Sequence, residues 1–243
     1  MHKKYFEGKK AVFFDLDGTV IDSIPMWKDA FMVVLDELGY LSEARDKYVD
    51  RGAYVSDIWK YIKKYPGVKI DLSIEELKQK THKAYLDLFN QTEKEPREGF
   101  WGLVSELKDK GIKLALVSNG DAEIVNPVIE KLDIKEGVFD LIVTGNQVKH
   151  RKPKPDVYKK ALKELGLNSK EVLCFEDSVG GSMAAKKAGL DTIAIWDGEV
   201  IETDYPRNVM TFLPDFSSFP GNLDTTYMEH AKKGVEYLEQ EIS

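Results

Sequence analysis

The sequence AVFFDLDGTVIDS, residues 11–23, is the segment from which the organisation of the chain follows. Four apolar residues, suited to a strand buried on both faces, lead directly into Asp15 and Asp17. Residues two apart on an extended chain point to the same side, so both carboxylates should project from the end of the strand. Carboxylates this close repel one another unless a cation lies between them or one takes a proton. The segment therefore predicts a strand that ends in a chemically active acid pair.

Two ordinary explanations compete with an active site. A calcium loop needs glycine at its sixth position and glutamate at its twelfth, whereas Gly18 is fourth and Met26 is twelfth. An Asx-type turn explains the glycine but not the apolar run before the acid pair. The calcium loop is therefore excluded, and the turn stays open as the simpler alternative.

Composition limits the class of protein and its partners. The 243 residues suit one sizeable domain, or a domain with a smaller insertion, and 42% of them are apolar. The net charge of −7 argues against broad binding to nucleic acid or to an anionic membrane. Cys174 is the single cysteine, and no apolar segment is long enough for a signal core or a membrane span. We expect a cytoplasmic protein that is a monomer or a weak dimer.

Helical periodicity replaces the strand pattern from residue 24 to about residue 95. Apolar residues recur at helical spacing over 27–38, 58–62 and 74–88, and a capping-box pattern at Ser73–Glu76 precedes the last run. This pattern, set between two strand-bearing regions, predicts an inserted helical subdomain.

The rest of the chain alternates strands with helices. Such alternation predicts an α/β fold, namely a Rossmann-like parallel sheet with helices on both faces. The expected strands after the first are 113–118, 139–144, 172–176, 192–196 and 210–213. The expected domains are a discontinuous catalytic core of residues 1–20 and 97–220, a helical cap of residues 21–96, and a C-terminal helical tail of residues 221–243 with a helix over 225–241.

Ligands of parallel sheets bind at the carboxyl ends of the strands, so polar residues at those positions matter most. They are Ser118 and Asn119, Glu176 and Asp177, and the lysine-rich segment 149–156. Each has a structural explanation as well: a turn before a helix capped by Asp121, a helix cap by Asp177 or Ser178, and a solvated charge run. Hydroxyl and amide donors at a strand end also suit a phosphate oxygen.

Four segments together resemble the motifs of the haloacid dehalogenase superfamily, whose members are mostly phosphatases. The segments are DLDGTV at 15–20, Ser-Asn-Gly at 118–120, Lys-Pro-x-Pro-Asp at 152–156 and Glu-Asp-Ser at 176–178. They occur in the family's order, each at an expected strand end or helix start, and the set is far more specific than any one motif.

The resemblance implies a role for each matched residue. Asp15 would be the nucleophile that becomes an aspartyl-phosphate, and Asp17 the general acid and base. Lys152 would stabilise nucleophile and phosphate, while Ser118 and Asn119 hold phosphoryl oxygens. Mg²⁺ would be held by Asp15, Asp17 and Asp177, with Glu176 either a ligand or a support for one.

The implied function is a magnesium-dependent phosphatase of a small phosphorylated metabolite, a sugar or polyol phosphate. Substrate choice would lie in the cap, where Arg51 falls in a loop that resembles the one entering the site in sugar-phosphate members. Trp27 lies on an apolar helix face, which favours core packing. Arg151 departs from the family pattern, which often has a small residue before the lysine.

Three alternatives stay open. A phosphomutase of the beta-phosphoglucomutase type shares all four motifs. A phosphonate hydrolase would need a Schiff-base lysine in the cap. A non-catalytic protein that binds a phosphorylated ligand on the same fold is the third, although the presence of every acid argues against it.

Overall fold

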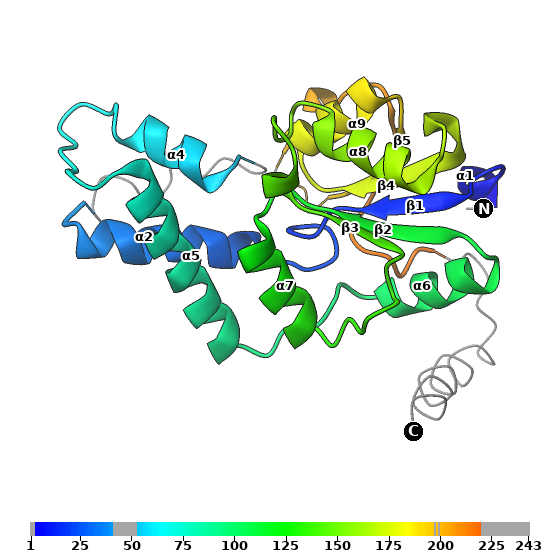
Figure 1. The fold of residues 1–243 in the computed structure, drawn as a ribbon, viewed down its shortest axis with the longest axis horizontal. Helices are drawn as coiled ribbons and strands as arrows, with labels where there is room; N and C mark the ends of the chain where they lie inside the picture. The colour runs from blue at the N-terminus through cyan, green and yellow to red at the C-terminus, as the bar shows by residue number, and fades with distance from the viewer. Residues whose placement is uncertain (1–2, 41–52, 197, 199, 220–243) are drawn as a thin grey trace.

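The computed structural model describes residues 3–40, 53–196, 198 and 200–219. They form an α/β fold around a six-stranded parallel sheet with the order β3-β2-β1-β4-β5-β6 (Figure 1). The strands are β1 (Ala11–Phe14), β2 (Lys113–Val117), β3 (Leu141–Val143), β4 (Val172–Glu176), β5 (Asp191–Ile195) and β6 (Val209–Leu213).

The register of the central strands brings the expected site residues to one edge of the sheet. β1 lies between β2 and β4, and its last residue, Phe14, is paired with Leu116 and with Phe175. The residues that follow these strands therefore meet at the carboxyl end of the sheet, as the sequence predicted.

Helices cover both faces of the sheet, because side chains along each buried strand alternate between the faces. Val12 and Phe14 pack in one apolar cluster with α6 (Phe100–Asp109) and α7 (Ala122–Lys131). Phe13 packs in the opposite cluster with α8 (Asp156–Leu165) and α9 (Val179–Ala188). Figure 1 shows the two pairs of helices on opposite sides of the strands.

A helical group lies beyond the carboxyl end of the strands (Figure 1). Its helices among the described residues are α2 (Ile24–Glu37), α4 (Val55–Ile62) and α5 (Ile74–Gln91). Ser73 caps α5 through the expected capping box with Glu76. Trp59 and Tyr85 are fully buried within the group and belong to the same apolar cluster as Phe14.

Arg97 fastens the two connections between the sheet and the helical group. Its Nε donates to the carbonyl of Gly18 at 3.0 Å, and its Nη2 donates to Asp22 Oδ1 at 3.2 Å. Its backbone N–H donates to the carbonyl of Val20 at 2.7 Å. The chain therefore leaves the sheet and returns to it at one place.

The strands agree with the sequence-based ranges to within one residue, except the third. β3 begins at Leu141 rather than at residue 139, because Asp140 uses its carboxylate to accept the backbone N–H of Leu114 and Phe139 turns into the core. The expected helix at 225–241 and the cap residue Arg51 lie outside the described residues. The short remaining elements within the described ranges are α1 (Lys3–Phe6) and the 3₁₀ helices η1 (Gly145–Gln147), η2 (Ser169–Glu171) and η3 (Glu202–Asp204).

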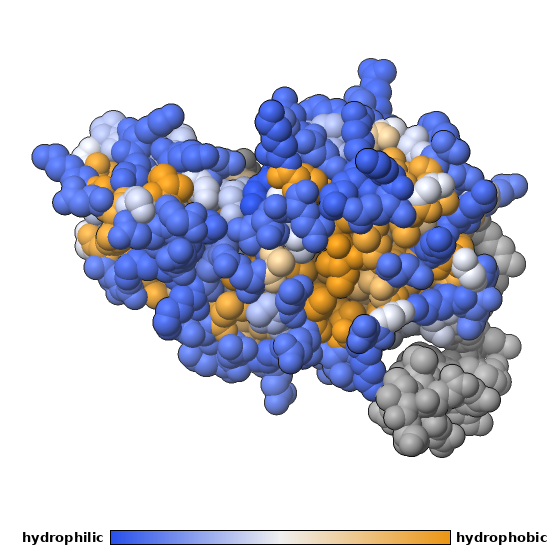
Figure 2. Space-filling view, in the orientation of Figure 1, coloured by the Kyte–Doolittle hydropathy of each residue, from blue (hydrophilic) through white to orange (hydrophobic). Residues whose placement is uncertain are grey.

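The face drawn in Figure 2 is polar around its margin, with apolar side chains gathered near its centre. A hollow at the β3 edge of the sheet is lined by the apolar side chains of Ile129, Ile134, Phe139 and Ile142.

None of the described helices combines the length and the apolar character that crossing a membrane requires.

Replacing Phe14 with alanine should lower the free energy of unfolding by about 3–5 kcal/mol, because it empties the centre of an aromatic cluster. The Phe14 ring lies 5.2 Å from the ring of Phe175 and 5.7 Å from that of Phe100, centroid to centroid. Urea unfolding measures the change. Ile201→Ala, at a side chain that is 67% exposed, should change stability by less than about 0.5 kcal/mol. A decrease in the free energy of unfolding of under about 1.5 kcal/mol for Phe14→Ala would show that the surrounding side chains repack into the space.

Candidate active site

A cavity of about 90 Å³ lies between the carboxyl ends of the strands and the helical group. Six of the eight residues expected in the site line it: Asp15, Asp17, Ser118, Asn119, Lys152 and Asp177. The helical group contributes apolar side chains to the opposite wall, among them Ile24, Phe31, Val55 and Ile58. The cavity is therefore polar where the strands end and largely apolar where the helices face it.

The Lys152 ammonium lies between two buried carboxylates. It donates to Asp15 Oδ1 at 2.5 Å, to Glu176 Oε1 at 2.6 Å and to the carbonyl of Val117 at 2.8 Å. Its side chain is 3% exposed, so water screens these contacts weakly. All three donor positions of the ammonium are directed at oxygen.

Burial and the opposite charge of the partner act against one another on the pKa of each member of this pair, and both pKa values are raised above their ordinary values. Burial raises the pKa of Asp15 to about 8, although the Lys152 ammonium acts against that rise. Burial alone would lower the pKa of Lys152, but the Asp15 and Glu176 carboxylates raise it above its ordinary value. Lys152 is therefore a permanent cation, and Asp15 is a carboxyl group whose ionisation responds to any further positive charge placed beside it.

Asp17 is oriented from the helical side of the cavity. Ser23 Oγ and the indole N–H of Trp27 both donate to its Oδ1, at 2.7 and 2.8 Å. The Trp27 ring stacks on Tyr85 with centroids 3.9 Å apart, so the indole is held flat while its N–H bonds to the acid. Trp27 thus does more than the core packing suggested by its helical spacing, and it is a residue of the cavity wall.

Asp177 approaches the first loop closely because Gly18 has no side chain. Gly18 has a φ of +84°, and a Cβ there would overlap the Asp177 carboxylate. Asp15, Glu176 and Asp177 each offer a carboxylate oxygen, and these oxygens lie within 4.8 Å of one another. Such a set of oxygen donors suits a hard divalent cation.

Glu176 lies behind Lys152 rather than in the cavity wall. It is fully buried, and its Oε1 accepts from Tyr158 Oη as well as from Lys152. Its Oε2 accepts from Ser178 Oγ at 3.4 Å, and a Cβ at Gly181 would overlap this carboxylate. These contacts favour a role in holding Lys152 over direct ligation, the less direct of the two roles that the sequence left open.

The Ser118–Asn119 turn connects the cavity to the loop 150–156 that carries Lys152, called the lysine loop. Ser118 Oγ accepts the backbone N–H of Gly120 at 2.9 Å. Asn119 Oδ1 accepts the backbone N–H of Lys152 at 2.8 Å, so Asn119 fixes the lysine loop in addition to lining the cavity. Ser178 caps α9 by accepting the N–H of Gly181 at 3.0 Å, as its position suggested.

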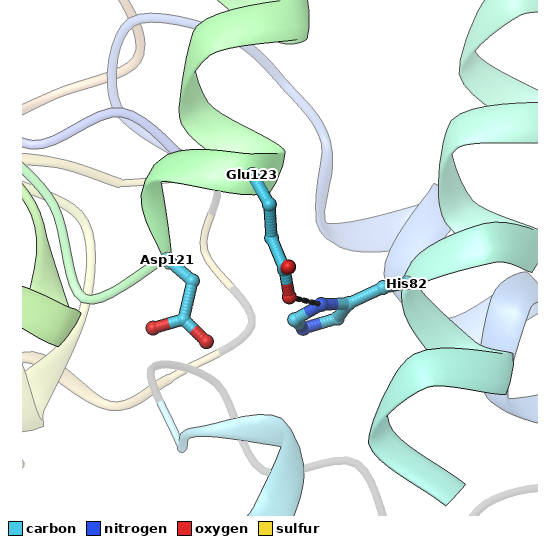
Figure 3. A group of neighbouring side chains, drawn as sticks. All are labelled: His82, Asp121 and Glu123. Carbon is cyan, nitrogen blue, oxygen red and sulfur yellow. Dashed lines mark hydrogen bonds and ion pairs between the residues drawn. The ribbon is translucent and has the colours of Figure 1, made fainter. Parts of the chain in front are cut away.

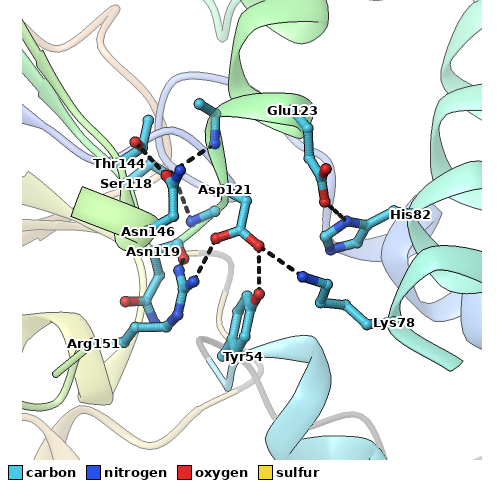
Figure 4. A network of polar contacts seen from close by, with 12 residues as sticks. Tyr54, Lys78, His82, Ser118, Asn119, Asp121, Glu123, Thr144, Asn146 and Arg151 are labelled. Carbon is cyan, nitrogen blue, oxygen red and sulfur yellow. Dashed lines mark hydrogen bonds and ion pairs between the residues drawn. The ribbon is translucent and has the colours of Figure 1, made fainter. Parts of the chain in front are cut away.

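Asp121 departs from its expected role as a helix cap. It occupies the N-cap position of α7, yet its side chain makes no capping hydrogen bond. Asn146 Oδ1 instead accepts the N–H of Ala122 at 3.2 Å. The Asp121 carboxylate faces Tyr54, Lys78 and Arg151, none of which the motifs had indicated as its partners (Figure 4).

His82 of α5 approaches the same region from the helical group. Its Nδ1 lies 2.9 Å from Glu123 Oε1, and Asp121 is nearby (Figure 3). Burial lowers the pKa of His82, which favours the neutral ring. Sequence offered no signal for this contact, because a lone histidine on a helix has no local partner.

A parallel sheet, a helical group after its first strand, and acids and a lysine gathered at the strand ends define an enzyme of the α/β class. Residues 12–195 match the haloacid dehalogenase-like hydrolase family, and the chain belongs to this family. It is a hydrolase, as the resemblance of its four motifs implied.

Individual relatives agree with this assignment. A phosphorylated carbohydrates phosphatase of Thermotoga maritima is 30% identical over 194 residues, which cover 76% of this chain and 83% of that protein. A phosphoglycolate phosphatase of Aquifex aeolicus is 32% identical over 206 residues, covering 81% and 90%. CbbY from Rhodobacter sphaeroides, crystallised in complex with phosphate, shares the fold with a TM-score of 0.78 at 24% identity, covering 87% of this chain and 96% of that one.

Asp15→Asn should make stability less dependent on pH. A carboxyl group whose pKa is 3.8 when unfolded and about 8 when folded stabilises the native state fully below pH 4, and this contribution is lost as the pH rises to 8. The side chain of asparagine has no carboxyl group and does not titrate over this pH range. The free energy of unfolding of Asp15→Asn, relative to the natural sequence, should therefore rise by at least about 1 kcal/mol between pH 5 and pH 8.

Urea unfolding at the two pH values, with a chelator present, measures this difference. Glu7→Gln, at an exposed residue, is the control and should leave the pH profile parallel to that of the natural sequence. Parallel profiles for Asp15→Asn as well would contradict a raised pKa.

Proposed function

We propose that this enzyme hydrolyses small phosphorylated metabolites, sugar or polyol phosphates, with Asp15 as the nucleophile and Mg²⁺ as the cofactor. The observation that supports the proposal is the contact between Lys152 and Asp15 at the wall of a cavity that Asp17 and Asp177 also line. A carboxylate held beside a fixed cation suits attack on an anionic phosphate. The relatives named as phosphatases of phosphorylated carbohydrates and of phosphoglycolate support the same reaction.

The residues present fit a magnesium ion. Asp15 and Asp177 would hold it, with Asp17 beside them, because all three line the cavity and the space left by Gly18 keeps Asp177 close. Mg²⁺ prefers oxygen ligands and retains water, so a few carboxylates suffice. When bound, the ion supplies positive charge that favours the ionised form of Asp15 and offsets the repulsion between nucleophile and phosphate.

The chain's own residues would carry the reaction in two stages. Asp15 attacks phosphorus, and Asp17 protonates the leaving oxygen as the aspartyl-phosphate forms. Asp17 then takes a proton from water, which attacks the aspartyl-phosphate and releases phosphate. Lys152 neutralises charge on Asp15 and on the phosphoryl oxygens, and Ser118 donates to one of those oxygens.

The helical group would serve as the cap of this site, a role that its place in the cavity wall supports. Its apolar side chains exclude bulk water from the reacting atoms. Residues 21–96 are then the cap domain, and residues 1–20 with 97–220 the core, joined where Arg97 fastens the two connections.

Phosphate release from a panel of phosphomonoesters tests the proposal. The panel contains hexitol phosphates, sugar phosphates, phosphoglycolate and p-nitrophenyl phosphate, each with Mg²⁺, with a chelator, and with Asp15→Asn. We expect release that the chelator abolishes and that Asp15→Asn lowers at least about 1,000-fold, since the covalent step then has no nucleophile. Near-normal turnover by Asp15→Asn would overturn the assignment. An isomeric sugar phosphate in place of inorganic phosphate, seen by phosphorus NMR, would identify a mutase.

Trp27→Phe should lower kcat about tenfold with little change in KM. Phenylalanine preserves the stacking on Tyr85 but removes the N–H that orients Asp17, and a hydrogen bond to a charged group contributes about 1.5–3 kcal/mol. Steady-state kinetics on the best substrate of the panel measure the effect. Trp101→Phe is the matched control, because Trp101 lies on α6 and is 39% exposed. Equal kcat values for both variants would show that the Trp27 N–H does not contribute to catalysis.

A further inference from the structure

A group of four polar side chains joins the helical group to the loops at the end of the sheet (Figure 4). Tyr54 Oη, at the start of α4, donates to Asp121 Oδ2 at 2.5 Å, and Lys78 Nζ of α5 donates to the same oxygen at 3.4 Å. Arg151 Nη2 donates to the other oxygen, Oδ1. These four residues, Tyr54, Lys78, Asp121 and Arg151, are called the clasp.

Arg151 also contacts Tyr54 directly. Its guanidinium carbon lies 3.7 Å from the centroid of the Tyr54 ring, a cation–π arrangement. Gly145 makes this position accessible, because a Cβ there would overlap the guanidinium. The side chain that departs from the family pattern is therefore specifically accommodated.

We propose that Asp121 is a positioning residue that couples the seating of α4 over the cavity to the placement of Lys152, acting through Tyr54 and Arg151. The proposal rests on the function proposed above, in which Lys152 stabilises the nucleophile. Asp121 and Arg151 do not line the cavity, so their effect on the reaction is indirect.

The contacts run without a gap from the clasp to the nucleophile. Arg151 Nη1 donates to the carbonyl of Asn119 at 2.5 Å, and the side chain of Asn119 accepts the backbone N–H of Lys152 at 2.8 Å. Lys152 then reaches Asp15 at 2.5 Å. Arg151 directly precedes Lys152 in the chain, so the clasp is also joined to the lysine through one peptide bond.

A metal site is the alternative explanation for Asp121. Its carboxylate and the side chains of His82 and Glu123 place ligand atoms within 4.8 Å of one another (Figure 3). Both oxygens of Asp121, however, already accept hydrogen bonds from Arg151, Tyr54 and Lys78. Two of these partners are cations, which would repel a bound metal ion. The geometry therefore favours the clasp.

Two conservative substitutions separate coupling from simple attachment of the helices. Tyr54→Phe keeps the ring on Arg151 and removes the hydroxyl that bonds to Asp121. Asp121→Asn keeps the shape and removes the charge. Each should lower kcat for p-nitrophenyl phosphate about tenfold, and the double substitution should lower it by less than the product of the two, since both break the same coupling.

Glu123→Gln is the matched control. Glu123 and Asp121 both join α7 to the helical group, but Glu123 contacts His82 instead of Arg151. Its substitution weakens attachment of the helices alone, and we expect kcat to stay within about twofold of the natural value.

Hydrogen exchange on the unliganded 243-residue chain gives a second measurement that needs no activity. Tyr54→Phe and Asp121→Asn should speed exchange both in the α4 segment 53–62 and in the lysine loop 150–156. Glu123→Gln should leave the lysine loop unchanged. Faster exchange in 53–62 alone, or a rise in KM with unchanged kcat, would overturn the coupling and leave Asp121 as an attachment point only.

The two measurements also separate this inference from the proposed function. If the natural enzyme releases no phosphate from any phosphomonoester, the proposed function fails, and the exchange of the lysine loop still decides whether the clasp reaches Lys152. If phosphate is released and exchange in the loop is unaffected by Tyr54→Phe, the function stands and the coupling fails.

Discussion

The buried ammonium of Lys152, enclosed between Asp15 and Glu176, is the interaction on which the rest of the site depends. Three ionisable groups are removed from water together, and the loss of Lys152 would leave two buried carboxyl groups with no cation between them. Neighbouring residues offset the cost of burying these groups. Tyr158 donates to Glu176, the carbonyl of Val117 accepts a hydrogen bond from the ammonium, and Gly181 leaves room for the glutamate carboxylate.

The cavity combines two kinds of wall that come from different parts of the chain. The strand ends supply charge, held at fixed positions by the register of β1 with β2 and β4. The helical group supplies apolar surface together with polar contacts, among them Trp27 to Asp17, Tyr54 and Lys78 to Asp121, and His82 to Glu123. The reacting groups are thus placed by the more rigid part of the fold, and the part that covers them is attached through a few named hydrogen bonds.

Local patterns in the sequence predicted the fold and six residues that line the cavity, because both are encoded over short distances. The run before Asp15, the turn at Ser118 and the acids after β4 each identify a strand end from adjacent residues. The orientation of those side chains was not predictable in this way. Asp121 has the local pattern of a helix cap, but its carboxylate bonds to Tyr54, 67 residues away, and Trp27 has the spacing of a core residue while its N–H bonds to Asp17. Such contacts depend on the packing of the helical group against the sheet, for which a single sequence carries no periodic signal.

The fastening of both connections by Arg97 bears on how the chain folds and how its length can vary. The central pair of strands, β1 and β2, can form only after the whole helical segment has been spanned, so the sheet is built from distant contacts and its assembly is slow relative to that of the helices. The entropy of closing such a loop grows only logarithmically, by about 0.6 kcal/mol for each doubling of its length. Residues can therefore be gained or lost between the two connections with little effect on the stability of the sheet, and the wall that faces the substrate can be remodelled while the charged wall stays unchanged.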